Sequence, residues 1–294
     1  MGFDVHLIDG TYELFRHFFA VPAHIAADGR DVAAARAVVG SLVTLLEEGA
    51  THMGVATDHV IESFRNDLWP GYKDGSGVDP VLLAQFPLLE AALEAAGLTV
   101  FAMVDVEADD ALAASAKVAA ADDRVDRVLI ATPDKDLAQC VVDGRIWQFD
   151  RRKRQLIGVA EVQEKFGVLP ESIPDYLALV GDSADGFPGV PGWGAKSAAA
   201  VLAKWGHVDD IPDDHLQWNV DVRGAGKLAV ALRDHRDNAE LFVRLATLVD
   251  DCETIDDVDE LRWTGPTADF ETVAEYLDAD VLLRRVNELA ATRR

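Results

Sequence analysis

The chain has 294 residues, with 52 Asp and Glu against 27 Lys and Arg, so its formal net charge is −25. Hydrophobic residues make up 49% of the sequence, which predicts a packed core and excludes global disorder. The length is typical of two domains or of one large domain. Taken alone, the negative charge argues against a nucleic-acid partner, because phosphates are held by Lys and Arg.

Two further classes of protein are excluded by the sequence. No apolar run approaches the roughly 18 residues of a membrane span, and two Asp fall within the first apolar stretch, so we expect a cytoplasmic protein without membrane contact. The cysteines, Cys140 and Cys252, lack the spacing of metal ligands. A disulfide framework or a zinc site is therefore not expected.

Strand and helix patterns alternate in the N-terminal half. Four short apolar runs end in carboxylates, at residues 5–9, 52–58, 100–110 and 128–136, and their apolar stretches of about 4 to 6 residues without alternation predict buried strands. Ala- and Leu-rich stretches with helical spacing lie between them, at residues 32–48, 80–96 and 108–121. This alternation predicts an α/β fold with a mainly parallel sheet.

The second half of the chain is helical. Helices are predicted at residues 159–166, 171–180, 196–205, 227–249 and 267–294, with an acidic connector at 250–260. A basic tetrad at residues 151–154 lies between two short apolar runs and is predicted to form a hairpin tip.

Carboxylates follow each predicted strand. Because the carboxyl ends of parallel strands meet at one edge of a sheet, we expect these side chains to lie close together. Two more carboxylates lie in a Gly-rich loop and can join them; the complete set is Asp9, Asp58, Glu107, Asp109, Asp110, Asp134, Asp136, Asp182 and Asp185. So many acids repel one another unless several are protonated or cations neutralise them, and oxygen ligands favour Mg²⁺ or Mn²⁺. Two such ions form the clamp used in phosphodiester hydrolysis.

Other phosphate chemistries fit less well. The run LIDGT is similar to the end of a haloacid-dehalogenase nucleophile motif, but Leu7 stands where that motif needs its nucleophilic aspartate. Neither a G-x-G-x-x-G after the first strand nor a G-x-x-x-x-G-K-[ST] occurs.

A loop in the second half has the features of an anion site. The run GFPGVPGWGAK opens a predicted helix with small residues, so its backbone N–H groups and Lys196 can approach a phosphate. An ordinary turn between helices is the alternative. Trp193 is expected to fill the core rather than to stack on a base.

The motifs together resemble the 5′-nuclease family, which includes the 5′-to-3′ exonuclease domain of bacterial DNA polymerase I and phage flap endonucleases. The resemblance covers nearly the whole chain and is carried, in order, by LIDGTYELFR, ATD, SFRNDLWPGYK, VEADDALA, TPDKDLAQ and LVGDSADGFPGVPGWGAKSA. Departures include Ala184 and Gly186 around Asp185, Trp193 in the GxG turn, and a single basic residue, Lys73, in the expected arch.

The resemblance implies a PIN-like nuclease core at residues 1–166, with a helical arch at about 66–98, and a helix-three-turn-helix and C-terminal helical region at 167–294. It assigns Asp9, Asp58, Glu107, Asp109 and Asp110 to a first metal group and Asp134, Asp136, Asp182 and Asp185 to a second, for two or three Mg²⁺ or Mn²⁺ ions. Arg16, Arg65 and Lys73 correspond to basic residues that hold the scissile phosphate. Contacts to DNA are implied for Tyr72, Gly189, Gly192, Gly194 and Lys196, with K⁺ bound at the glycine-rich loop.

We therefore expect a monomeric, metal-dependent nuclease that hydrolyses DNA at 5′ flaps and 5′ ends and leaves 5′-phosphate and 3′-hydroxyl. Two alternatives share some of these features. A PIN-type ribonuclease would have the same strand-end acids, and a non-catalytic protein that binds DNA structures would tolerate them as a residual site.

Overall fold

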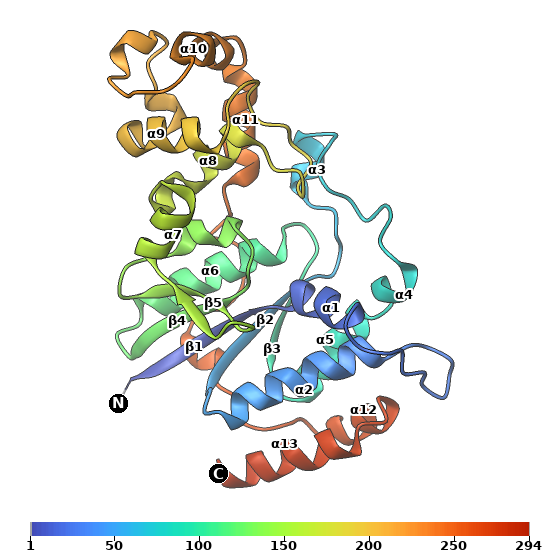
Figure 1. Cartoon of the computed structure of the whole chain (residues 1–294). Helices are drawn as coiled ribbons and strands as arrows, with labels where there is room; N and C mark the ends of the chain where they lie inside the picture. The colour runs from blue at the N-terminus through green and yellow to red at the C-terminus, as the bar shows by residue number, and fades with distance from the viewer. Residues whose placement is uncertain (1, 294) are drawn as a thin grey trace. The chain divides into compact units, whose positions relative to one another are not determined.

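The computed structural model describes residues 2–293 and divides into two compact units (Figure 1). Unit 1 comprises residues 2–61, 75–132 and 249–293, and unit 2 comprises residues 62–74 and 133–248. The chain thus passes between the units four times, whereas the sequence suggested two consecutive segments. Within residues 2–293, no helix is long and apolar enough to cross a membrane.

Unit 1 is built on a parallel sheet with the strand order β3-β2-β1-β4. Its elements are β1 (Phe3–Asp9), α1 (Gly10–Phe18), α2 (Ala33–Glu47), β2 (His52–Asp58), α4 (Pro80–Leu83), α5 (Phe86–Ala95), β3 (Thr99–Met103), α6 (Ala108–Ala121), β4 (Val125–Ala131), the short 3₁₀ helix η5 (Val258–Leu261), α12 (Phe270–Tyr276) and α13 (Asp280–Thr292). The predicted α/β class with a mainly parallel sheet is confirmed.

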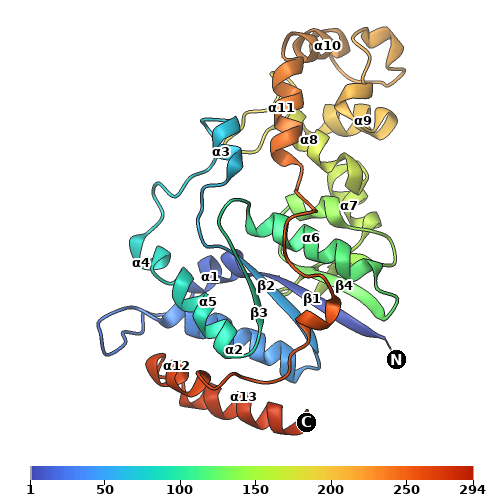
Figure 2. The same cartoon turned by 180° about the vertical axis from the view of Figure 1, so that it is seen from behind.

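The helices of unit 1 cover both faces of this sheet. Helix α6 packs along β1 to β4 on one face, and α1, α2 and α5 cover the other, with α12 and α13 outside α5 and α2 (Figures 1 and 2). Strand β2 is buried at every position but its last, and β1 is buried from Leu7 to Asp9, because both faces of the sheet are covered there; Asp4 and His6 interrupt the apolar run of β1. Strands β1, β2 and β3 run parallel, so Asp9 and Asp58 end neighbouring strands at the same edge.

The predicted helix at 80–96 is interrupted between α4 and α5, and Gln85 lies at the break. Its buried amide oxygen accepts hydrogen bonds from Ala34 N and Ala35 N, each 3.1 Å long. Helix α2 lacks a capping side chain at Val32, so Gln85 satisfies N–H groups that would otherwise be unpaired.

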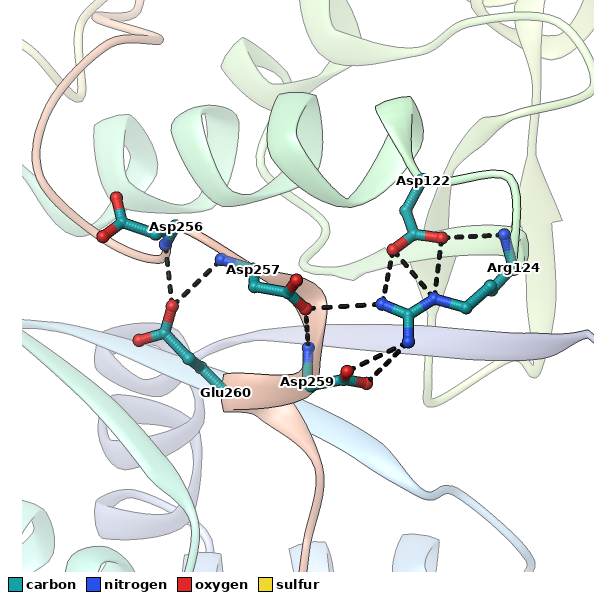
Figure 3. Close-up of polar contacts among 6 residues, drawn as sticks. All are labelled: Asp122, Arg124, Asp256, Asp257, Asp259 and Glu260. Carbon is teal, nitrogen blue, oxygen red and sulfur yellow. Dashed lines mark hydrogen bonds and ion pairs between the residues drawn. The ribbon is translucent and has the colours of Figure 1, made fainter.

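The acidic connector at 250–260 is organised by one arginine (Figure 3). The guanidinium of Arg124 donates to Asp122 at 2.7 Å, to Asp259 at 2.9 Å and to Asp257 at 3.3 Å. The side chain of Glu260 accepts from Asp256 N and Asp257 N. These contacts hold the connector against the loop between α6 and β4.

Unit 2 contains one short hairpin and a set of helices. Its elements are α3 (Phe64–Leu68), the 3₁₀ helix η1 (Asp136–Cys140), β5 (Ile146–Asp150), β6 (Gln155–Ile157), α7 (Val159–Phe166), η2 (Pro170–Ser172), α8 (Ile173–Val180), α9 (Ala195–Trp205), η3 (Val208–Asp210), η4 (His215–Gln217), α10 (Ala225–Asp234) and α11 (Arg236–Ala246). Strands β5 and β6 are antiparallel, so the basic tetrad lies at a hairpin tip as predicted.

The core of unit 2 joins segments that are distant in sequence. Helices α8 and α11 pack against each other (Figure 2). The ring of Phe242 stacks on Phe187 and meets Trp69 edge-on, which ties residues 62–74 to the glycine-rich loop. Trp193 is buried in this core and its indole N–H donates to Leu228 O, which confirms the expectation of core filling.

Two helices predicted as continuous are broken. The stretch predicted at 227–249 forms α10 and α11, because His235 leaves the helical region of backbone conformation. Arg236 then donates to the carbonyl groups of Val208 and Ile211, which fixes the restart. In the stretch predicted at 267–294, Asp278 has a φ of 50° and separates α12 from α13.

A histidine and a buried carboxylate join α8 to η3. Asp175 accepts a hydrogen bond from Val208 N at 2.7 Å, and its other oxygen lies 2.9 Å from His207 Nδ1. The hydrogen bond to Asp175 raises the pKa of His207 above its usual value, in spite of partial burial. The protonated imidazole is therefore the form that stabilises unit 2.

This pair predicts a pH-dependent contribution to stability. Because the folded-state pKa of His207 is raised, its contribution is fully present below the unfolded-state pKa of about 6.5 and is lost as pH rises through the folded-state value. Urea titrations between pH 6 and pH 9 should show the wild-type advantage over His207→Gln shrinking as pH rises. In the His207→Gln background, Asp175→Asn should not change how the free energy of unfolding depends on pH over this range. A difference between wild type and His207→Gln that does not vary with pH would contradict the assignment.

Candidate metal centre and phosphate-binding residues

The strand-end acids of unit 1 are held by hydrogen bonds. Asp9 begins α1, where its Oδ1 accepts from Tyr12 N at 2.7 Å and its Oδ2 from Thr132 Oγ1 at 2.8 Å. Asp58 Oδ1 accepts from Ala108 N at 2.8 Å, which ties the end of β2 to the start of α6. These bonds orient the two carboxylates.

The other acids of unit 1 lie in the first turn of α6. Glu107 and Asp110 are buried and Asp109 is half-buried. Asp110 accepts from Glu107 N at 2.9 Å and from Val249 N at 2.8 Å, so both of its oxygens bind backbone groups. These bonds give Asp110 an anchoring role in this unit, and ligation of a metal by Asp110 remains a prediction.

The acids of unit 2 come together through a tight turn. Backbone hydrogen bonds between Asp182 and Phe187 close the turn that carries Asp182 and Asp185. Asp136, in the first turn of η1, completes the group: Asp136, Asp182 and Asp185 each offer one carboxylate oxygen, and these oxygens all lie within 4.8 Å of one another. All three residues are buried, and Asp134 accepts a hydrogen bond from Asp136 N beside them.

Two lysines offset part of this negative charge. Lys135 forms an ion pair with Asp182 Oδ2 and lies 3.7 Å from Asp136 Oδ1, and Lys73 Nζ lies 3.0 Å from Asp185 Oδ1. Burial lowers the pKa of Lys135, but the charge of Asp136 and the hydrogen bond to Asp182 outweigh it and raise the pKa. The pKa of Asp136 is raised by burial and by repulsion from Asp134 and Asp185.

The residues of this cluster fit a divalent cation. Three carboxylate oxygens at this separation are hard ligands of the type that Mg²⁺ and Mn²⁺ prefer. Asp136 Oδ1 is buried and accepts no hydrogen bond, so it has a lone pair to offer. Asp136, Asp182 and Asp185 would hold the ion, and such an ion supplies polarisation of a phosphodiester and acidification of water.

The predicted phosphate-holding residues lie in different environments. Lys73 is the most accessible, with one third of its side chain exposed. Arg16 pairs with the buried Glu13 one turn earlier in α1. Arg65 is 1% exposed, and its guanidinium donates to Leu245 O at 2.8 Å and Thr247 O at 3.1 Å. This arrangement caps the end of α11 and favours a structural role for Arg65 over the predicted contact with phosphate.

The predicted DNA-binding residues also divide into two groups. Tyr72 is 5% exposed and packs in the core of unit 2, which favours packing over contact with DNA. Gly189 and Gly192 have φ of 71° and 83°, and a Cβ on Gly189 would lie 2.4 Å from Gly181 N, so this turn requires glycine. Gly194 precedes α9, and Lys196 is exposed in the first turn of that helix.

Sequence reasoning missed several partners of these residues. It gave no role to Lys135, although its position between two acids was a signal. It also missed Glu90, a buried acid in the mainly apolar helix α5. Glu90 is buried and binds both neighbours of Asp58: Thr57 Oγ1 donates to it at 2.7 Å, and His59 Nδ1 lies 2.7 Å away.

Comparison with known proteins gives family matches over most of the chain. Residues 4–167 match the family model of the 5′-3′ exonuclease N-terminal, resolvase-like domain, and residues 168–269 match that of the 5′-3′ exonuclease C-terminal SAM fold. DNA polymerase I of Pseudomonas aeruginosa is 36% identical over 298 residues, which cover 96% of this chain and 32% of that protein. DNA polymerase I of Bacillus subtilis is 31% identical and is covered to the same extent. The chain therefore spans about one third of these relatives.

Solved structures show the same fold. T5 5′-exonuclease with bound divalent zinc ions has a TM-score of 0.68 and 19% identity, covering 97% of this chain and 98% of that one. The catalytic core of Rad2 in complex with a DNA substrate has a TM-score of 0.63 and 14% identity, with coverage of 98% and 92%. The two family models, which match residues 4–269, and the polymerase relatives establish that the chain belongs to the 5′-3′ exonuclease family.

Proposed function

We propose that the chain is a structure-specific 5′-nuclease that hydrolyses DNA at 5′ flaps and 5′ ends by a two-metal-ion mechanism, leaving 5′-phosphate and 3′-hydroxyl. The observation that carries this proposal is the group of buried carboxylate oxygens of Asp136, Asp182 and Asp185 within 4.8 Å of one another. Three buried carboxylates at this distance repel one another unless they are protonated or neutralised by cations, and two divalent ions would form the clamp that assists phosphodiester hydrolysis.

The remaining acids have distinct tasks in this proposal. Asp9, Asp58, Glu107, Asp109 and Asp110 of unit 1 form the first metal group, and the hydrogen bonds to Asp9 and Asp58 orient their carboxylates. Asp134 completes the second group. Mg²⁺ and Mn²⁺ are the proposed ions, because every proposed ligand is a carboxylate oxygen.

Basic residues would bind the substrate phosphates. Lys73 is placed to hold a phosphate, because its ammonium lies beside Asp185 and is partly exposed. Arg16 is the second candidate, from the same helix that Asp9 caps. Lys196 and the N–H groups at the start of α9 would bind the phosphate backbone of duplex DNA, with K⁺ at the loop of Gly189, Gly192 and Gly194.

A cleavage assay tests the activity. Asp182→Asn removes the negative charge of one of the three clustered carboxylates. We expect it to reduce the rate of cleavage of a 5′-flap DNA by a factor of about 100 or more. Asp210→Asn, which changes an exposed acid of η3, is the matched control and should leave the rate unchanged. Turnover that persists in excess EDTA would overturn the metal mechanism, and faster cleavage of the equivalent RNA flap would redirect the proposal to a ribonuclease.

Salt dependence tests the proposed contact with duplex DNA. Lys196→Ala should weaken binding of a nicked duplex and reduce the slope of log K against log salt by about 1, because one phosphate contact is lost. Lys204→Ala, in the last turn of the same helix, provides the control. If the slope stays at the wild-type value in Lys196→Ala, the loop is a structural turn.

A further inference from the structure

Lys135 occupies an unusual position in unit 2. It lies in sequence between Asp134 and Asp136, and its ammonium pairs with a third carboxylate, Asp182. The side chain of Asp182 is 2% exposed, whereas 31% of the Lys135 side chain is exposed. The ammonium of Lys135 therefore contacts a buried carboxylate, while its side chain is exposed enough for the ammonium to return to water.

The ammonium competes for oxygens that a metal ion would use. Lys135 Nζ contacts Asp182 Oδ2 and lies 3.7 Å from Asp136 Oδ1, and both residues belong to the group whose oxygens lie within 4.8 Å. Asp136 Oδ1 is buried without a hydrogen-bond partner, and the buried Asp182 Oδ2 is paired with the ammonium of Lys135, so the charge of Lys135 compensates both carboxylates. A cation between these two carboxylates must either displace the ammonium or be repelled by it.

Lys73 is held differently. Its backbone N–H donates to Asp185 O, and its carbonyl accepts from Asn66 Nδ2. It pairs with Asp185, whereas Lys135 approaches two of the three clustered acids. Of these two lysines, Lys135 therefore shares more of the oxygens proposed for the metal.

We propose that Lys135 is an internal counter-cation that neutralises Asp182 and Asp136 in the metal-free protein and sets the affinity of the site by competing with the divalent ion. The proposal rests on the proposed function, because it takes these carboxylates as metal ligands. It adds a regulatory residue that does not itself bind metal. Loss of the ammonium should strengthen metal binding, although it removes a favourable ion pair from the metal-free protein.

Binding of Mn²⁺ alone tests this inference. Calorimetric titration of the full chain without DNA should show that Lys135→Met, which keeps an unbranched side chain but no charge, binds Mn²⁺ about tenfold more tightly than wild type, equivalent to about 1.4 kcal/mol. Lys135→Arg should stay near the wild-type affinity, because the charge is retained. Lys117→Met, which breaks the exposed pair with Asp250, is the matched control and should have no effect.

Wild-type protein gives a second measurement that needs no folded variant. Displacement of the ammonium from Asp182 should make Lys135 more reactive, so its acylation rate by an amine-reactive ester, followed by mass spectrometry, should rise several-fold when Mg²⁺ is added. Lys117 serves as the internal reference. An unchanged rate at Lys135 would overturn the displacement.

The outcomes separate this inference from the proposed function. If wild type binds Mn²⁺ and Asp182→Asn abolishes that binding, but Lys135→Met binds no more tightly, then the counter-cation role is wrong and the metal centre stands. If wild type shows no binding that depends on Asp182, then the metal centre and the counter-cation role both fail.

Discussion

An ionised carboxylate that is buried without a partner costs several kcal/mol, and both units of this chain bury carboxylates where elements meet. The two units meet this cost in different ways. In unit 1, backbone N–H groups and hydroxyls satisfy Asp9 and Asp110, so these acids also cap helices and anchor loops. In unit 2, lysine ammonium groups lie against Asp182 and Asp185.

This difference has a consequence for metal binding. In unit 1, an oxygen of Asp9 or Asp110 that accepts one hydrogen bond keeps a second lone pair for another partner. In unit 2, the ammonium groups of Lys135 and Lys73 lie against the clustered acids. A cation bound between those oxygens would therefore have to displace an ammonium group or be repelled by it.

The strands and most helices could be read from local sequence. The run of β2 is confirmed at His52–Asp58 and the helix of α6 at Ala108–Ala121, because burial on both faces of a sheet and a long Ala-rich period leave unambiguous patterns. The edge shared by Asp9 and Asp58 followed from the parallel sheet alone. The proposed metal ligands were predicted from their positions after strands and from the family resemblance.

What could not be predicted depends on contacts between distant residues. Gln85 accepts hydrogen bonds from the first turn of α2, about fifty positions earlier in the sequence. Arg65 is buried and donates to carbonyl groups at the end of α11. The break at His235 is fixed by Arg236, which reaches carbonyls near residue 210. Local propensity carries no information about such partners, so continuous helices were expected. The assignment of Arg65 to a phosphate came from the family resemblance and stays a prediction.

The net charge of −25 is divided unevenly between the two units, and this division changes what the charge implies about a nucleic-acid partner. Within the described residues, unit 1 holds 10 Lys and Arg against 31 Asp and Glu, whereas unit 2 holds 16 against 21. Unit 2 contains Lys196, Lys73 and the basic tetrad at the hairpin tip, so its surface can approach a phosphate backbone at little electrostatic cost. The acids of unit 1 repel such a backbone unless cations neutralise them, and Arg16 offsets them only locally. Under the proposed function, the net charge therefore does not exclude a DNA substrate, and contact with the acids of unit 1 depends on bound metal.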